Sequence, residues 1–183
     1  AQAARFAQRP ASGVDAIATV VVAPGPGLAR IFKDVGVDKI VSGGQGTNPS
    51  VQELLAAVEG VNAGTVLILP NNNNIMLTAA QVQKLTQKRV LVVPTQTIPQ
   101  GVSAMLAFNG QKDAETNLAR MAQAGQSVRT LEITRAEAES NLNGVAIEPG
   151  NWLALLDQEL VAVGQKDLDV VQQGLSRLPV QNY

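Results

Sequence analysis

The 183-residue sequence has no cysteine and no histidine. These two absences exclude disulfide bonds, thiolate nucleophiles, Ser-His and Cys-His catalytic pairs and imidazole general bases, and they remove the usual ligands of zinc. Aromatic residues make up only 3% of the chain, with Trp152 as its single tryptophan, which we expect in a core. Whatever this chain does, it does without an imidazole or a thiol.

An excess of charge of one sign is also missing. The 14 basic and 15 acidic residues nearly cancel, and the lysines and arginines do not cluster, so no nucleic-acid partner is expected. The carboxylates are scattered, and no Asp-rich loop of the kind that holds Mg²⁺ occurs. We therefore expect no metal and no cofactor in this chain.

Long apolar runs are absent as well. The longest, residues 16–23, is far shorter than the roughly 20 residues of a membrane-spanning helix. The opening segment lacks the apolar stretch of a signal peptide, and residues 1–13 have the composition of a linker or boundary. The sequence predicts a soluble, cytoplasmic protein with no membrane span.

A repeated pattern of strand, loop and helix dominates residues 14–110. Four apolar, β-branched runs predict strands at 17–23, 39–42, 65–69 and 89–93. Each is followed by a loop rich in Gly, Pro, Asn or Thr and then by a helical pattern, at about 28–35, 51–58, 76–85 and up to 108. This alternation is typical of an α/β fold with a parallel sheet.

The pattern changes over residues 111–183. A helix is predicted at about 114–124, followed by short alternating runs at 127–134, 144–147, 152–156 and 160–163. Turn residues separate these runs, as in antiparallel hairpins. Helical spacing of leucine and valine at 167–178 then predicts a C-terminal helix. We expect a parallel βα core followed by a mainly antiparallel β region.

The loops that follow the predicted strands are the one site that the pattern places. In an open α/β sheet, ligands bind at the carboxyl ends of the strands. The candidate ligand-binding residues are Gly43, Gly44, Gln45, Asn48, Ser50, Asn71, Asn72, Asn74, Thr95 and Thr97. Their uncharged hydroxyls and amides suit hydrogen bonding to a neutral or anionic group, and we predict no catalytic residue.

An ordinary structural role for these loops stays open. Residues 43–50 match neither the P-loop nor the dinucleotide-binding order of glycines, and Asn48 or Ser50 can simply cap the following helix. The asparagine run at 71–74 can form local side-chain turns instead of a binding surface.

Three motifs at these loops resemble a known family. Gly43-Gly44-Gln45 with Asn48-Pro49-Ser50, Leu69-Pro70-Asn71-Asn72 with Asn74-Ile75, and Val93-Pro94-Thr95 with Ile98-Pro99-Gln100-Gly101 occur in this order. They resemble the C-terminal domain of the ATP-binding subunit of bacterial fatty-acid kinase, also described as dihydroxyacetone-kinase-like or DAK phosphatase. The resemblance continues through Asn117, Gly144, Ile147 and Gly150.

The resemblance implies that ATP binding, presentation of the fatty acid and docking are carried out by different domains or proteins. In that family an N-terminal domain, which is expected to be absent from this sequence, carries ATP and Mg²⁺. A separate DegV-like fatty-acid-binding protein presents the acid for acyl phosphate synthesis in phospholipid metabolism. The C-terminal domain is similar in fold to the DegV and dihydroxyacetone-kinase substrate-binding superfamily. It is expected to be non-catalytic and to dock the acyl-carrying partner or assist assembly.

The resemblance also leaves other roles open. A small-ligand binding module, for a fatty acid or a phosphorylated metabolite, and a homodimerisation domain are the alternatives. Two departures from the family pattern, Gly46-Thr47 for Thr-Met and Asn73 for lysine, remove features that favour an anion.

Overall fold

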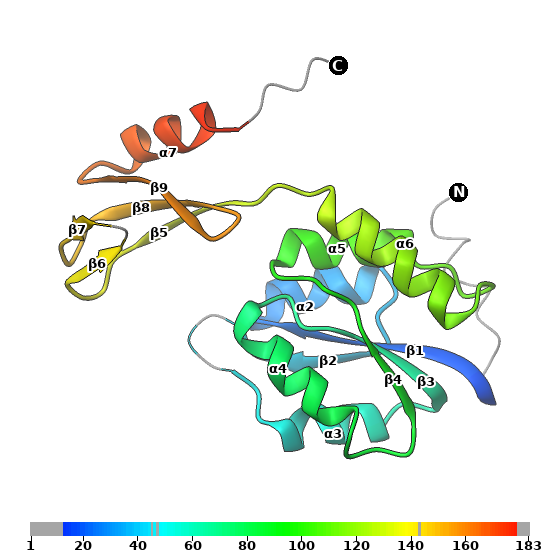
Figure 1. Cartoon of the computed structure of the whole chain (residues 1–183). Helices are drawn as coiled ribbons and strands as arrows, with labels where there is room; N and C mark the ends of the chain where they lie inside the picture. Colours follow the sequence, from blue (N-terminus) through cyan, green and yellow to red (C-terminus); the bar gives the residue numbers. More distant parts are fainter. Residues whose placement is uncertain (1–12, 45, 47, 143, 179–183) are drawn as a thin grey trace, which may run out of the picture. The chain divides into compact units, whose positions relative to one another are not determined.

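Four parallel strands form the sheet of the first part of the chain, in the order β2-β1-β3-β4 (Figure 1). The computed structural model describes residues 13–44, 46, 48–142 and 144–178, with side chains from residue 16 onward. The strands are β1 (Gly13–Ala23), β2 (Lys39–Ser42), β3 (Ala63–Leu69) and β4 (Arg89–Val92). The predicted parallel sheet is confirmed. Residues 1–12 of the predicted linker lie outside the described residues.

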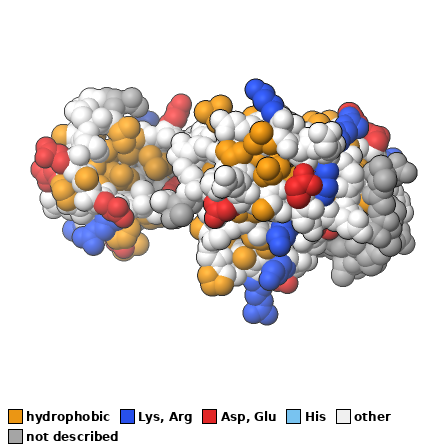
Figure 2. Space-filling model, turned by 90° about the horizontal axis from the view of Figure 1, so that it is seen from below, with side chains coloured by type: hydrophobic (Ala, Val, Ile, Leu, Met, Phe, Trp, Pro, Cys, Tyr) orange, Lys and Arg blue, Asp and Glu red, His pale blue; other side chains and the backbone are white. Residues whose placement is uncertain are grey.

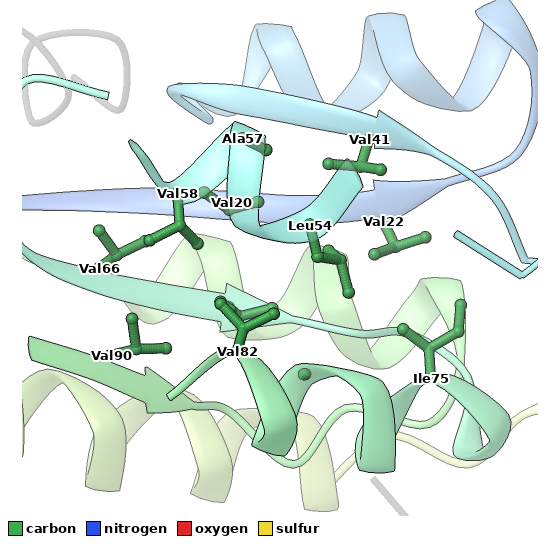
Figure 3. Close-up of a cluster of buried hydrophobic side chains, with 12 residues drawn as sticks. Val20, Val22, Val41, Leu54, Ala57, Val58, Val66, Ile75, Val82 and Val90 are labelled. Atoms are coloured by element: carbon green, nitrogen blue, oxygen red, sulfur yellow. The ribbon is translucent and has the colours of Figure 1, made fainter. Parts of the chain in front are cut away.

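Alternation along β1 builds two apolar layers, one on each face of the sheet. Val20 and Val22 point to one face, whereas Val21 and Ala23 point to the other, and all four are buried. The first face packs against α3 (Val51–Glu59) and α4 (Asn73–Val82), as Figure 3 shows. The second packs against α2 (Gly25–Asp34), α5 (Ile98–Ala107) and α6 (Ala114–Gln126). A strand covered on both faces needs the continuous apolar sequence seen here.

Three helices begin earlier than the sequence predicted, and one of them is α5, which starts at Ile98 although a helix was expected only after Gly101. Helix α2 starts at Gly25 instead of about residue 28, and Pro26 in its first turn is compatible with a helix because the first amide groups need no intrahelical partner. Helix α4 starts at Asn73 instead of about residue 76. The asparagine run is therefore only partly a loop.

The second unit is antiparallel. Strands β5 (Leu131–Arg135), β8 (Trp152–Leu156) and β9 (Glu159–Gly164) form one sheet, and β6 (Ser140–Leu142) pairs with β7 (Val145–Ile147). Helix α7 (Asp167–Ser176) packs on the three-stranded sheet through Val170 and Gly174. The antiparallel region and the C-terminal helix are confirmed, but β6 was not predicted, because its three exposed residues show no apolar alternation.

The chain divides into compact units at Ala1–Val128 and Arg129–Tyr183, whereas the sequence pattern changes at residue 111. Helix α6 accounts for the difference, since its Met121 joins the apolar layer that also holds Phe32 and Met105. Along the chain α6 continues to Gln126, and the strand expected at 127–134 begins only at Leu131, as β5. Within the described residues, no helix has both the length and the apolar character that crossing a membrane requires.

Candidate functional site

The strand order gathers four loops at one edge of the parallel sheet. β1 and β3 are neighbours, and the connection from β1 leads to β2 on one side whereas the connection from β3 leads to β4 on the other. In open α/β sheets a crevice forms at such a switch point, outside the carboxyl ends of the strands. The loops that begin at Pro24, Gly43, Pro70 and Val93 all follow these carboxyl ends. The predicted site residues that the structure describes are therefore on a common edge of the first unit.

The loop after β2 lies against the loop after β1. The Gly43 amide donates to the Ala23 carbonyl over 3.3 Å. Gly44 has a φ of +130°, and a Cβ there would lie 3.3 Å from Pro24 Cδ. Glycine is required for this conformation and for the close approach. The predicted ligand residue Gln45 lies outside the described residues.

The candidate residue Ser50 caps the N-terminus of α3. Its hydroxyl accepts from the Glu53 amide over 3.2 Å, while the Glu53 carboxylate accepts from the Ser50 amide and hydroxyl, each over 2.8 Å. This reciprocal pair is a capping box for α3. The backbone and then the side-chain hydrogen bond from Ser50 lower the pKa of Glu53. Asn48, two residues earlier, is exposed.

Asn71 lies inside the edge instead of on its surface. Only 6% of the residue is exposed, and its φ is +55°. The side-chain Nδ2 donates to the Val22 carbonyl over 3.0 Å, and the backbone amide donates to Thr95 Oγ1 over 3.3 Å. Thr95 is fully buried. These two candidate residues join the ends of β1, β3 and β4, and neither presents its side chain to solvent.

Asn72 and Thr97 also act as helix caps. The Asn72 side chain accepts from the Asn74 amide over 2.8 Å at the start of α4. Thr97 Oγ1 accepts from the Gln100 amide over 3.4 Å at the start of α5. Asn72 and Thr97 are half-buried and Asn74 is exposed. The interpretation of these polar residues as ordinary caps therefore agrees with the geometry, and the exposed groups of the edge include Asn48 and Asn74.

The electrostatics of the edge come from backbone dipoles. Residues 24–29, 43–50, 70–74 and 93–100 contain no Asp, Glu, Lys or Arg. Helices α2, α3, α4 and α5 all begin here, so their positive dipole ends point the same way. Such an edge offers uncharged hydrogen-bond donors and acceptors, and the carboxylate of Glu53 at the start of α3 is engaged by Ser50. Among the described residues, no group of three or more His, Cys, Asp or Glu could hold a metal ion.

Three structural residues were not predicted from the sequence. Gly101 makes room for the Asn71 side chain, Lys88 binds carbonyls at the end of α3, and the buried amide of Asn117 organises the loop before α6. Gly101 and Asn117 both formed part of the family resemblance, but no role was assigned to either. Periodicity could not identify any of the three, because their partners are distant in sequence or lie in irregular loops.

Charged groups elsewhere on the molecule are dispersed. On the face shown in Figure 2, lysine and arginine side chains lie among uncharged, hydrophobic and acidic side chains. Two arginines form ion pairs with acidic residues of their own unit, Arg89 with Glu115 and Arg129 with Asp157. The face in Figure 2 therefore carries no continuous basic surface of the kind that follows a nucleic-acid backbone.

Comparison with known proteins gives close relatives over most of the chain. The protein YloV of Bacillus subtilis is 38% identical over 159 residues, which cover 87% of this chain and 29% of YloV. The uncharacterized proteins SERP0792 of Staphylococcus epidermidis and SAUSA300_1119 of Staphylococcus aureus are 32% and 30% identical over 161 residues, 88% of this chain and 29% of each relative. The chain thus spans less than a third of the length of these curated relatives.

A family model matches residues 18–182, which include both units. The match spans the four-stranded sheet, its polar edge and the antiparallel unit with α7. On this evidence, the chain belongs to the FakA-like family of C-terminal domains of fatty acid kinase subunits.

Proposed function

We propose that this chain is a non-catalytic domain of a fatty-acid kinase and that it docks the acyl-carrying, DegV-like partner or assists assembly of the kinase. The observation that carries the proposal is the family match over residues 18–182, in a chain that corresponds to 29% of its relatives' length. The remaining length of such a protein has room for the ATP- and Mg²⁺-binding domain. A homodimer is a further possible assembly.

The chemistry of the chain supports a non-catalytic role. Phosphoryl transfer needs positioned metal ions and cationic groups around the phosphates. The loops of the carboxyl edge contain no charged residue that could hold such an ion or contact the phosphates, and the chain has no histidine to hold a sugar substrate covalently. The relation of the four-stranded sheet to the DegV and dihydroxyacetone-kinase substrate-binding fold belongs to this proposal.

A binding measurement tests the docking role. The 183-residue chain is mixed with a fatty-acid-loaded DegV-like protein, and the masses present are determined by native mass spectrometry and analytical ultracentrifugation. We expect a heterocomplex and no ATP hydrolysis by the chain alone. Docking is rejected if the two proteins sediment independently at concentrations well above those at which the kinase subunits act together.

Convergence of three polar loops favours a second candidate, a small-ligand module. Asn48 and Asn74 are exposed beside four helix N-termini, where the head group of a fatty acid or phosphorylated metabolite could accept hydrogen bonds. Native mass spectrometry of the purified chain would then show a retained small molecule. We expect N48A to release it and N62A, which changes an exposed asparagine at the opposite edge, to retain it. Equal retention by both variants rejects this candidate.

A further inference from the structure

Arg135 and Trp152 form a fixed pair at one end of the antiparallel sheet. The two residues are direct partners across β5 and β8. The guanidinium carbon of Arg135 lies 5.8 Å from the centre of the Trp152 ring, within the range of a cation–π contact. Arg135 Nε also donates to the Gly150 carbonyl over 3.0 Å. The guanidinium is therefore held from two directions, although the residue is exposed.

The backbone around this pair is shaped to accept the guanidinium. Gly150 has a φ of +89°, and a Cβ there would lie 3.5 Å from Arg135 Nη2. The Ala136 amide donates to the Asn151 carbonyl and the Gly150 amide donates to the Ala136 carbonyl, each over 2.8 Å. Glycine is needed for the backbone conformation, and the paired amides hold the two segments together. The backbone next to Arg135 is thus fixed by two hydrogen bonds to the segment at 150–151.

The terminal nitrogens of Arg135 have no acidic partner among the described residues of their own chain. Arg129 and Arg89 are ion-paired with carboxylates, whereas Arg135 forms no ion pair within the described part of the chain. A guanidinium presents a planar fork that matches the two oxygens of a carboxylate. Because the fork is already oriented by Trp152 and Gly150, less side-chain freedom is lost when such a group binds.

The surroundings favour a carboxylate on a protein over a free anion. A single exposed ion pair in water is weak, and the exposed side chains of Glu137, Glu139 and Glu148 lie in the neighbouring loops and repel free anions. A protein surface can offset both effects, because it excludes water from the ion pair and can place its own uncharged or basic groups beside the glutamates. Arginine and tryptophan are among the residue types most enriched at the positions that dominate protein interfaces.

We propose that Arg135, supported by Trp152 and Gly150, binds the carboxylate of an aspartate or glutamate on the acyl-carrying protein partner. This inference rests on the proposed docking function and adds a specific contact to it. The contact is a bidentate pair between the terminal nitrogens of Arg135 and the two carboxylate oxygens. The partner surface around that carboxylate is uncharged or basic, since the glutamates near Arg135 would repel further acidic groups.

Three variants of the 183-residue chain test the contact by calorimetric titration with the fatty-acid-loaded DegV-like protein. R135Q removes the charge, R135K keeps the charge but lacks the planar fork, and R177Q removes an exposed arginine of the same unit as a matched control. We expect R135Q and R135K each to weaken binding about tenfold or more, and R177Q to bind within about twofold of the wild type. Circular dichroism establishes that all three are folded.

The outcomes separate this inference from the docking proposal. If the wild type binds the partner and R135Q and R135K bind equally well, docking stands and the role of Arg135 is wrong. If the wild type does not bind, the docking proposal fails and this inference fails with it. The ¹⁵N resonance of Arg135 Nε is also followed during titration with inorganic phosphate alone. A saturating shift there would identify a free-anion site and overturn the assignment to a partner carboxylate.

Discussion

The side chain of Asn71 occupies the space that a side chain on Gly101 would need. A Cβ added to Gly101 would lie 2.1 Å from Asn71 Oδ1 and 2.6 Å from its Cγ. The same Oδ1 is buried and has no hydrogen-bond partner among the described residues, while the neighbouring Nδ2 is bonded to the Val22 carbonyl. Asn71 therefore links β1 to the first turn of α5, and the small residue at 101 makes that link possible.

We expect G101A to destabilise the chain by about 1–3 kcal/mol, because the added methyl group overpacks the site. The same substitution in an N71G background should be neutral or stabilising, since the space is then free and alanine favours a helix more than glycine does. Glycine also accepts the φ of +55° at position 71. Urea unfolding of the two single variants and the double variant measures the coupling. Additive effects would show that the two residues do not compete for this space.

Asn117 provides a second test of a buried amide. The residue is fully buried, and its Nδ2 donates to the carbonyls of Asn109, Lys112 and Asp113 over 2.9, 3.0 and 3.1 Å. Its Oδ1 accepts from the Asn109 amide over 2.8 Å. The two hydrogens of this amide are shared among three carbonyls, so the loop between α5 and α6 depends on one side chain for most of its hydrogen bonding.

We expect N117A to lower the free energy of unfolding by about 2–4 kcal/mol, because several buried backbone groups lose their partner. N117D keeps the shape but loses the donors and should be at least as damaging. N48A, at an exposed asparagine, serves as the control and should change stability by less than about 0.5 kcal/mol. A loss for N117A no larger than that of N48A would contradict this role.

Lys88, which lies outside α3, caps the C-terminal end of that helix. Its Nζ donates to the carbonyls of Val58, Glu59 and Val61 over 2.8, 3.0 and 2.6 Å. The last carbonyls of α3 have no intrahelical partners, and a cation at this end is favoured by the helix dipole. We expect K88M to lower the free energy of unfolding by about 1–3 kcal/mol. Thermal unfolding compares it with K84M, which changes an exposed lysine; equal melting temperatures would contradict the role of Lys88.

Strands and helices with a continuous or periodic apolar pattern were predictable from the sequence, whereas contacts between residues distant in the sequence were not. Continuous apolar character at Val20, Val21 and Val22 was enough to predict a strand covered on both faces, and this is what the structure shows. Asn71 was predicted to bind a ligand because its loop follows a strand at the carboxyl edge of the sheet, beside other polar loops. Its burial follows from Thr95 and Gly101, which are adjacent to it only after β3 and β4 have paired.

Helix ends were predictable where a local hydrogen bond determines them. Ser50 was one of two predicted caps for α3, and it is the cap because Glu53 lies three residues later and completes the box. For α4, the asparagine run gave no means of choosing the first helical residue, since all four side chains are the same. The bond from the Asn74 amide to Asn72 identifies the cap in the structure. Whether the exposed groups of the edge bind a ligand stays a prediction.

Two carboxylates at helix N-termini should make stability depend on pH. Asp113 caps α6, and hydrogen bonds from the backbone and then the side chain of Thr116 lower its pKa. The pKa of Glu53 is lowered by Ser50 in the same way. A carboxylate with a lowered pKa in the folded state contributes stability above its unfolded pKa. That contribution is lost as the pH falls through the folded value.

We therefore expect the chain to lose stability as the pH falls below about 4.3, where unfolded Glu and Asp begin to bind protons before the folded carboxylates do. D113N should reduce this pH dependence, because asparagine caps a helix without titrating in this range. Thermal unfolding at a series of pH values compares D113N and E53Q with the wild type, and NMR titration of the side-chain carboxyl carbons gives the two pKa values directly.

T116V removes only the hydroxyl donor, so it should move the pKa of Asp113 part of the way back toward its ordinary value. If the titration of Asp113 were the same in T116V and the wild type, the Thr116 hydroxyl would not contribute to the shift, and the shift would come from the Thr116 backbone amide.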